Sequence, residues 1–223
     1  MPDMAAGSER WAIVVPVKRL AVAKTRIDLD PEVRMELALA MAADTVRAAS
    51  ACPEVRLVVA VCDDPDALES LRQAGAVVVP DEPNAGLNPA LVHGASVGVV
   101  PPDHAVAAIA ADLPALRSHE LADVLRRAAG RACSFVADAS GSGTTVFAAA
   151  DRAAFEPSFG PDSRSRHVAA GATDLTDRAG VTLRRDVDTI ADLLDAIRLG
   201  VGPATAAVTR ALAWSDASDG PPV

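Results

Sequence analysis

The feature that most constrains the fold is a regular alternation of short apolar runs with longer Ala-rich or charged segments. The run WAIVVPV spans 11–17, RLVVAVC spans 56–62, AVVVP spans 76–80 and HAVAAIAA spans 104–111. Runs of this length, rich in Val and Ala and bounded by Pro, Gly or Asp, are typical of buried strands. Because parallel strands need crossover helices, the alternation predicts an α/β fold with a mostly parallel, doubly wound sheet.

Helix start and stop signals fill the intervals between these runs. An Asp followed by a Pro opens two predicted helices, at 30–31 and at 64–65; the first is expected to run to about Ser50 and the second to stop at Gly75. Further helices are expected over 89–98, 117–129, 189–199 and 203–214. A capping box of Thr189 and Asp192 is expected to open the helix over 189–199.

The pattern changes after Ala132. The strand-like runs CSFVAD and TTVFAAA are separated only by ASGSG, which leaves no room for a helix and predicts an antiparallel excursion. A Pro- and Gly-containing loop then leads to a short helix that begins at Ser163 or Ser165. We therefore expect one domain over 11–214, with a flexible N-terminus at 1–10 and a flexible tail at 215–223.

Composition excludes several classes of function. Aromatic residues are 3% of the 223 residues, so the core must be built largely from Ala, Val and Leu. The formal charge of -9 argues against nucleic acid or an anionic membrane as partner. No apolar run reaches about 18 residues, so the cytoplasm is the expected compartment. The three cysteines, Cys52, Cys62 and Cys133, lack metal-site spacing and are expected to be reduced thiols.

Polar residues follow the predicted strands, where ligands of open parallel sheets bind. Cations come after the first strand, at Lys18, Arg19, Lys24 and Arg26; Asp81 and the 86–88 turn follow the third strand, and Asp112 follows the fourth. Cations facing isolated carboxylates suit a nucleoside triphosphate with magnesium. The chain has neither a Walker loop nor a GxGxxG motif.

Each of these signals also has a simpler structural interpretation. The basic residues could be solvated surface charges, and Asp112 could begin a turn with Leu113 and Pro114. Asp186 and Asp188 could serve only helix capping. The four histidines, His93, His104, His119 and His167, are too scattered for a metal pattern and are expected on the surface or in the core.

The order of the motifs is more specific than any one of them. From the N-terminus they are VPVKRLAVAKTRI, GLNPAL, ADLPAL, GSGTT, FGPDSRSRHVAAGA and RRDVDTIADL. Over roughly 11–205 this series resembles the guanylyltransferases of coenzyme F-420 biosynthesis. The resemblance implies a nucleotidyltransferase fold of the glycosyltransferase-A-like type. Where sugar-nucleotide and molybdenum-cofactor enzymes carry a GxxxR(M) loop, this chain has PVKRLAVAKTR.

The family resemblance also implies an activity and a set of site residues. The activity is transfer of GMP from GTP to phosphoenolpyruvate, giving enolpyruvyl-diphospho-guanosine and pyrophosphate, with Mg²⁺. The resemblance assigns Asp112 and Asp188 to the metal, with Asp186 as a second choice, and makes Lys18 and Lys24 their catalytic companions. Expected acceptor ligands are Thr145, Gly160, Ser163, Arg164 and Arg166, and expected nucleotide ligands are Pro16, Lys18, Lys24, Arg26 and Asn88.

Several alternatives stay open at this level. The acceptor could instead be 2-phospho-L-lactate or 3-phosphoglycerate, or the chain could be a molybdopterin guanylyltransferase. A non-catalytic nucleotide-binding regulator is the alternative from another class, although the presence of both Asp112 and Asp188 beside Lys24 argues against it. A downstream transferase of the same pathway is a further expected partner.

Overall fold

The strands form one sheet whose order differs from their order along the chain. The computed structural model describes residues 11–20, 24, 26–82 and 84–218, with side chains as far as Leu212. The strands are β1 (Trp11–Pro16), β2 (Val55–Val61), β3 (Val77–Val79), β4 (Ala105–Ile109), β5 (Ser134–Ala137), β6 (Thr144–Ala149) and β7 (Thr173–Asp174). Their order in the sheet is β3-β2-β1-β4-β6-β5-β7.

The sheet is mostly parallel, as the sequence predicted. β1 pairs in parallel with β2 and β4, and β2 pairs in parallel with β3. β6 runs antiparallel to both β4 and β5, which is the predicted antiparallel excursion. After β1 the chain first builds outward through β2 and β3 and then returns to β4 on the other side of β1. Loops that leave the carboxyl ends of β1 and β4 therefore diverge and open a crevice between them.

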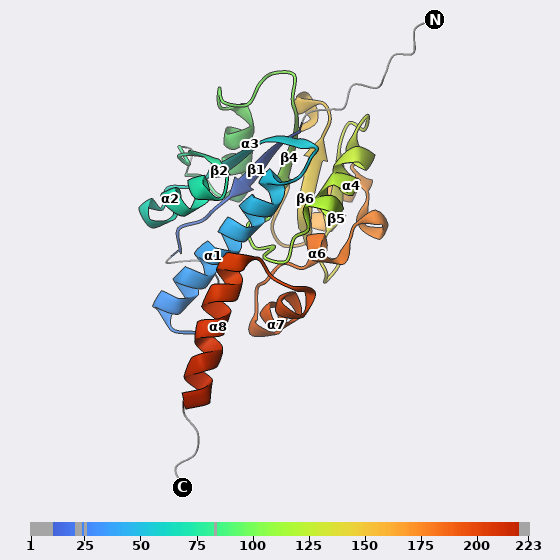
Figure 1. Cartoon of the computed structure of the whole chain (residues 1–223). Coiled ribbons are helices and arrows are strands. Elements are labelled where there is room, and N and C mark those ends of the chain that lie inside the picture. Colours follow the sequence, from blue (N-terminus) through green and yellow to red (C-terminus); the bar gives the residue numbers. More distant parts are fainter. Residues whose placement is uncertain (1–10, 21–23, 25, 83, 219–223) are drawn as a thin grey trace, which may run out of the picture.

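Helices cover both faces of the sheet (Figure 1). They are α1 (Pro31–Ser50), α2 (Pro65–Gln73), α3 (Leu87–Ser96), α4 (Ser118–Ala128), α5 (Ser163–Ala169), α6 (Val181–Arg184), α7 (Ile190–Leu199) and α8 (Pro203–Ser218), with 3-10 turns η2 (Arg152–Ala154) and η3 (Thr176–Arg178). The predicted caps form: the side chains of Asp30 and Asp64 accept backbone hydrogen bonds, and Thr189 and Asp192 make the capping box. No described helix is long and apolar enough to cross a membrane.

Some boundaries differ from the predicted ones. α3 begins two residues before Pro89, because a proline is tolerated in the first helical turn, and α8 continues past 214 to Ser218. The two-residue β7 and the four-residue α6 were missed because such short elements carry no periodicity. The predicted flexible N-terminus, 1–10, lies outside the described residues, and so do residues 219–223 of the predicted flexible tail 215–223; residues 215–218 of that tail belong to α8.

The core is divided by the sheet. One cluster lies between the sheet and α1, α2 and α4, and a second lies on the opposite face under α3. A third joins Ile27 to α1, α7 and α8, and Figure 1 shows α8 lying along α1. Gly94 lets α3 approach the sheet closely, since a Cβ there would come within 2.5 Å of the Val61 side chain. This close packing holds the first turn of α3 in place beside the crevice.

Candidate active site

The loop after β1 turns Lys24 inward. The Leu20 backbone N–H donates to Asp64 Oδ2 at 2.8 Å, and Ile27 is fully buried in the third core cluster. Between these anchors Lys24 has a φ of 53°, a conformation that is uncommon for a residue with a side chain. Its side chain is 12% exposed. Lys24 is therefore not a solvated surface charge, whereas Lys18 and Arg26 are exposed.

The loop after β4 is fixed by a threonine from α1. The buried Thr45 hydroxyl accepts from the Leu113 N–H at 3.0 Å, and its one hydrogen is shared between the Met41 carbonyl at 2.9 Å and the Ala111 carbonyl at 3.2 Å. These bonds hold the backbone on both sides of Asp112. The Asp112 carboxylate points to Lys24 and does not serve to begin a turn with Leu113 and Pro114.

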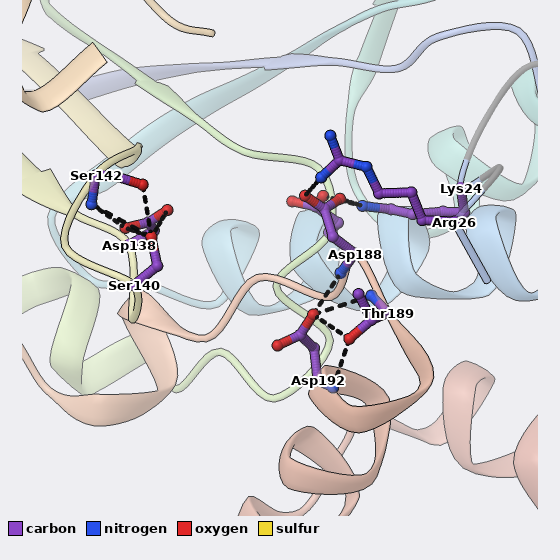
Figure 2. A network of polar contacts seen from close by, with 9 residues as sticks. Lys24, Arg26, Asp138, Ser140, Ser142, Asp188, Thr189 and Asp192 are labelled. Atoms are coloured by element: carbon purple, nitrogen blue, oxygen red, sulfur yellow. Dashed lines mark hydrogen bonds and ion pairs between the residues drawn. The ribbon is translucent and has the colours of Figure 1, made fainter. Parts of the chain in front are cut away.

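The segment that carries Asp188 is joined directly to the Asp112 loop. The Val187 N–H donates to the Asp112 carbonyl at 3.1 Å, although the two residues are far apart in sequence. Thr189 and Asp192 cap α7: the Thr189 hydroxyl accepts from the Asp192 N–H, and Asp192 Oδ2 accepts from the N–H groups of Asp188 and Thr189 at 3.3 and 2.9 Å (Figure 2). The Asp188 side chain is thus left free for the site.

The two carboxylates meet on one ammonium group. Lys24 Nζ donates to Asp112 Oδ2 and, at 2.9 Å, to Asp188 Oδ1. Arg26 Nη1 lies 3.8 Å from Asp188 Oδ2, and Figure 2 shows both basic side chains approaching Asp188. Burial by itself would lower the pKa of Lys24, but Asp112 and Asp188 raise it above its ordinary value. Burial likewise opposes ionisation of Asp188, yet Lys24, Arg26 and Lys18 bring its pKa below the usual range.

Negative charge remains in excess around Asp186. Burial, and then the carboxylates of Asp112, Asp138 and Asp188, raise the pKa of Asp186 to about 7. Asp138 is held by the Ser140 hydroxyl and by the Ser142 N–H in a neighbouring loop (Figure 2). One ammonium therefore does not compensate all the carboxylates here, and further positive charge would be stabilised.

Two hollows adjoin these groups. The first, of about 320 Å³, is lined by Lys24, Asp112, Asp188 and the Phe159 ring, and also by Pro16, Lys18 and Arg26. The second, of about 250 Å³, is lined by Asp63 and Asp81 at the ends of β2 and β3. The hollows share Pro16, Val17, Lys18 and Leu87, so they form one groove along the carboxyl edge of the sheet.

The residues predicted to hold the acceptor come from β6, from α5 and from the loop before α5, and none of them lines either hollow. The Thr145 and Ser163 hydroxyls are buried and have no hydrogen-bond partner among the described residues. Gly160 has a φ of 119°, and a Cβ there would meet Arg166 at 3.4 Å. Arg164 pairs with Asp174 at 3.1 Å, and Arg166 donates to backbone carbonyls of the loop before α5. Both arginines thus stabilise loops in this structure, and their contact with an acceptor stays a prediction.

Asn88, predicted to contact the nucleoside, makes a different contact here. Its side-chain amide accepts from the Phe159 N–H at 2.8 Å and donates to the Phe159 carbonyl at 3.1 Å. Asn88 lines neither hollow. A role toward the nucleoside stays a prediction.

His167 is a residue whose importance the sequence did not indicate. It is fully buried, it stacks on Phe135 and Phe147, and its Nε2 accepts from the Ser158 N–H at 3.0 Å. Burial, with a smaller effect of Arg166, lowers its pKa to about 4, so the ring is neutral. It belongs to the core, as expected, but it also fixes the loop that carries Phe159. The sequence offered no local signal for this, because the orientation of the ring depends on its packing against Phe135 and Phe147 of two different strands.

The donor set around Lys24 fits a magnesium ion. Asp112 and Asp188 both reach one cationic atom, and carboxylate oxygens are the ligands that Mg²⁺ prefers. Within the described ranges no group of three or more His, Cys, Asp or Glu side chains converges as a complete protein cage. A site with two protein carboxylates is the usual arrangement when substrate phosphates and water complete the coordination of Mg²⁺.

A doubly wound sheet with an antiparallel strand, and a groove of cations and carboxylates at its carboxyl edge, defines the class of nucleotidyltransferase-like proteins. A protein described as a nucleotide-diphospho-sugar transferase from Desulfovibrio desulfuricans shares this fold, with a TM-score of 0.65 at 15% identity over 90% of this chain and 94% of that one. Within that class the chain belongs to the family described as Guanylyl transferase CofC like, which it matches over residues 11–217.

Curated relatives are similar over most of the chain. A phosphoenolpyruvate guanylyltransferase from Thermomonospora curvata is 54% identical over 89% of this chain and 88% of its own length. One from Streptomyces coelicolor is 51% identical over 91% of this chain and 97% of its own length. The resemblance drawn from the motifs is thereby confirmed at the level of the family. The chain is a guanylyltransferase by family, and family members of this class generally depend on a divalent metal.

Proposed function

We propose that this chain transfers GMP from GTP to phosphoenolpyruvate, giving enolpyruvyl-diphospho-guanosine and pyrophosphate, in coenzyme F-420 biosynthesis. The observation that carries the proposal is the convergence of Asp112 and Asp188 on Lys24 inside the groove. Relatives at about half identity, which are named for this activity, support the choice of acceptor. The cytoplasm is the proposed compartment, since GTP and phosphoenolpyruvate are found there.

The reaction needs no general base. A phosphate oxygen of phosphoenolpyruvate is already ionised near neutral pH, and it forms a bond to the α-phosphorus of GTP. The bond from that phosphorus to the bridging oxygen breaks, and pyrophosphate leaves with its electron pair. Two polyanions repel each other by roughly 4 kcal/mol per unit-charge pair at about 4 Å and an effective dielectric near 20. The chain must therefore supply positive charge where the phosphates meet.

The residues of the first hollow are suited to that task. Lys18, Lys24 and Arg26 face the triphosphate, and Lys24 stabilises the departing pyrophosphate. Asp112 and Asp188, with Asp186 beside them, would hold Mg²⁺, which when bound neutralises phosphate charge and aligns the two substrates. Lys24 is shared by both carboxylates in this structure, so it offsets part of their negative charge before the substrates arrive.

The acceptor side is assigned to Thr145, Gly160 and Ser163. Two buried hydroxyls without partners are costly to a fold, and an anion that accepts hydrogen bonds from them would remove that cost. The Gly160 N–H likewise has no partner among the described residues. Arg164 and Arg166 add positive charge at the same helix.

The second hollow is assigned to the guanosine. The Asp81 backbone N–H donates to Asp63 Oδ1 at 2.9 Å, and Asp81 Oδ1 accepts from the Asn84 N–H at 3.2 Å, so both carboxylates are oriented. Guanine carries two adjacent donors, N1–H and the N2 amino group, which a carboxylate can accept together. Adenine places an acceptor at N1 and would be repelled. We therefore assign the selection of guanine to Asp81.

The test is a transfer assay with a panel of acceptors. The pure protein is incubated with GTP and Mg²⁺ and with phosphoenolpyruvate, 2-phospho-L-lactate or 3-phosphoglycerate in turn, and pyrophosphate and the product mass are measured. The proposal expects the fastest release with phosphoenolpyruvate. Faster release with another acid would reassign the acceptor, and release no faster than without any acid would favour a non-catalytic nucleotide-binding protein.

A further inference from the structure

The loop that joins η2 to α5, residues 155–162, forms one wall of the first hollow through Phe159. It has no regular secondary structure, so its backbone polar groups need partners from elsewhere. Two of its residues, Ser158 and Phe159, have both their N–H and carbonyl groups bonded to side chains. The loop is therefore held in one conformation by side chains and not by a ladder of backbone bonds.

Three side chains hold this loop, and they come from two helices, α5 and α3. His167 binds the Ser158 N–H, and Arg166 donates to the Ser158 and Pro161 carbonyls; both belong to α5. Asn88 comes instead from the first turn of α3, next to Leu87, which lines both hollows. Among the described residues that hold the loop, Asn88 alone reaches it from the nucleotide side.

The Asn88 contact is chemically specific. Its carbonyl oxygen accepts from the Phe159 N–H and its amino group donates to the Phe159 carbonyl, so one side chain satisfies both polar groups of one residue. An aspartate has the same shape but keeps only the acceptor half of the pair when ionised. The next residue after Phe159 is Gly160, whose N–H points to no partner among the described residues. Holding Phe159 therefore also fixes the direction of the Gly160 N–H.

We propose that Asn88 is a positioning residue that connects the nucleotide side of the groove to the acceptor loop. It holds Phe159, and through it Gly160, at the place where the phosphate of the acceptor is bound. Because α3 is packed tightly on the sheet at Gly94, Asn88 provides a rigid reference point for an otherwise irregular loop. The identity of the acceptor in this inference rests on the proposed function. The geometry of the loop is independent of that function.

The variant Asn88→Asp tests the inference. At pH 8 it should raise the KM for phosphoenolpyruvate about tenfold or more, because one partly buried hydrogen bond is lost and the Phe159 carbonyl is left without its donor. The dissociation constant for GTP, measured by calorimetry without acceptor, should stay within about twofold. As the pH is lowered, the activity of the variant relative to the wild type should recover, because a protonated carboxyl group regains a donor. Gln73→Glu, the same amide-to-acid change on the exposed surface of α2, is the matched control.

Hydrogen exchange in the free protein provides a readout that does not depend on catalysis. The peptide covering 155–162 should exchange faster in Asn88→Asp and in Asn88→Ala than in the wild type, with unchanged exchange in β1 and β4. Equal losses of GTP and acceptor affinity would overturn the inference in favour of a nucleoside contact. Unchanged exchange, or no recovery at low pH, would also overturn it. Failure of wild-type transfer to phosphoenolpyruvate would instead refute the proposed function.

Discussion

Replacing Asp112 with Asn tests the candidate site most directly, because the change removes one charge and almost no volume. The Asp112 side chain is 22% exposed and contacts Lys24, so its environment is closer to an effective dielectric of 20 than to water. A unit-charge pair about 4 Å apart is worth roughly 4 kcal/mol there. If about two thirds of that energy is realised in the transition state, kcat falls about 100-fold.

The same variant should stay folded. The backbone around Asp112 is held by Thr45 and by the Val187 N–H, and these bonds do not involve the carboxylate. The variant loses the ion pair with Lys24, but it also loses the repulsion between Asp112 and Asp186 that helps to raise the pKa of Asp186. The two effects offset each other. We expect the free energy of unfolding to change by no more than about 1 kcal/mol, a shift in Tm of roughly 2–4 °C for a chain of this size.

The assay is pyrophosphate release under saturating GTP, acceptor and Mg²⁺, together with thermal unfolding followed by circular dichroism. Asp123→Asn is the matched control, because Asp123 also pairs with one cation, Arg126, but lies on the exposed side of α4. Normal turnover of Asp112→Asn would remove this residue from the catalytic machinery. A large fall in Tm with the loss of activity would show that the ion pair is structural.

Three further outcomes are expected. Thr145→Ala and Ser163→Ala should each raise the KM for the acid several-fold and leave the GTP dissociation constant within about twofold; equal losses in a calorimetric titration would argue against separate pockets. Asp81→Asn should abolish the preference for GTP over inosine triphosphate, which lacks the N2 amino group, and a preference retained in competition assays would place base recognition elsewhere. His167 is neutral when folded, with a pKa of about 4 against 6.5 in the unfolded chain, so the unfolded state binds more protons between these values. Stability should therefore fall as the pH is lowered from about 6.5 to about 4, by at most roughly 3 kcal/mol, and urea unfolding of His167→Gln should lack this slope.

The local elements of the fold follow from sequence because their causes are local. Val-rich runs, the Asp-Pro pairs at 30–31 and 64–65, and the Thr189 capping box act over a few residues, and each produced the predicted element. The antiparallel excursion could also be predicted, because ASGSG is too short for a crossover helix. The family could be inferred from the order of motifs, each of which lies at an end of a strand or at the start of a helix.

Only the tertiary structure decided how the polar residues are used. The sequence places Lys24, Asp112 and Asp188 in three separate loops, and their meeting depends on the sheet order and on the bond from Val187 to Asp112. It also left open whether Asp188 caps a helix; Thr189 and Asp192 form the cap of α7, and the Asp188 side chain pairs with Lys24 instead. Asn88 acquires a partner far along the chain at Phe159, and His167 is packed between Phe135 and Phe147 of two different strands. Such contacts depend on packing between distant segments, and no local pattern of residues specifies them.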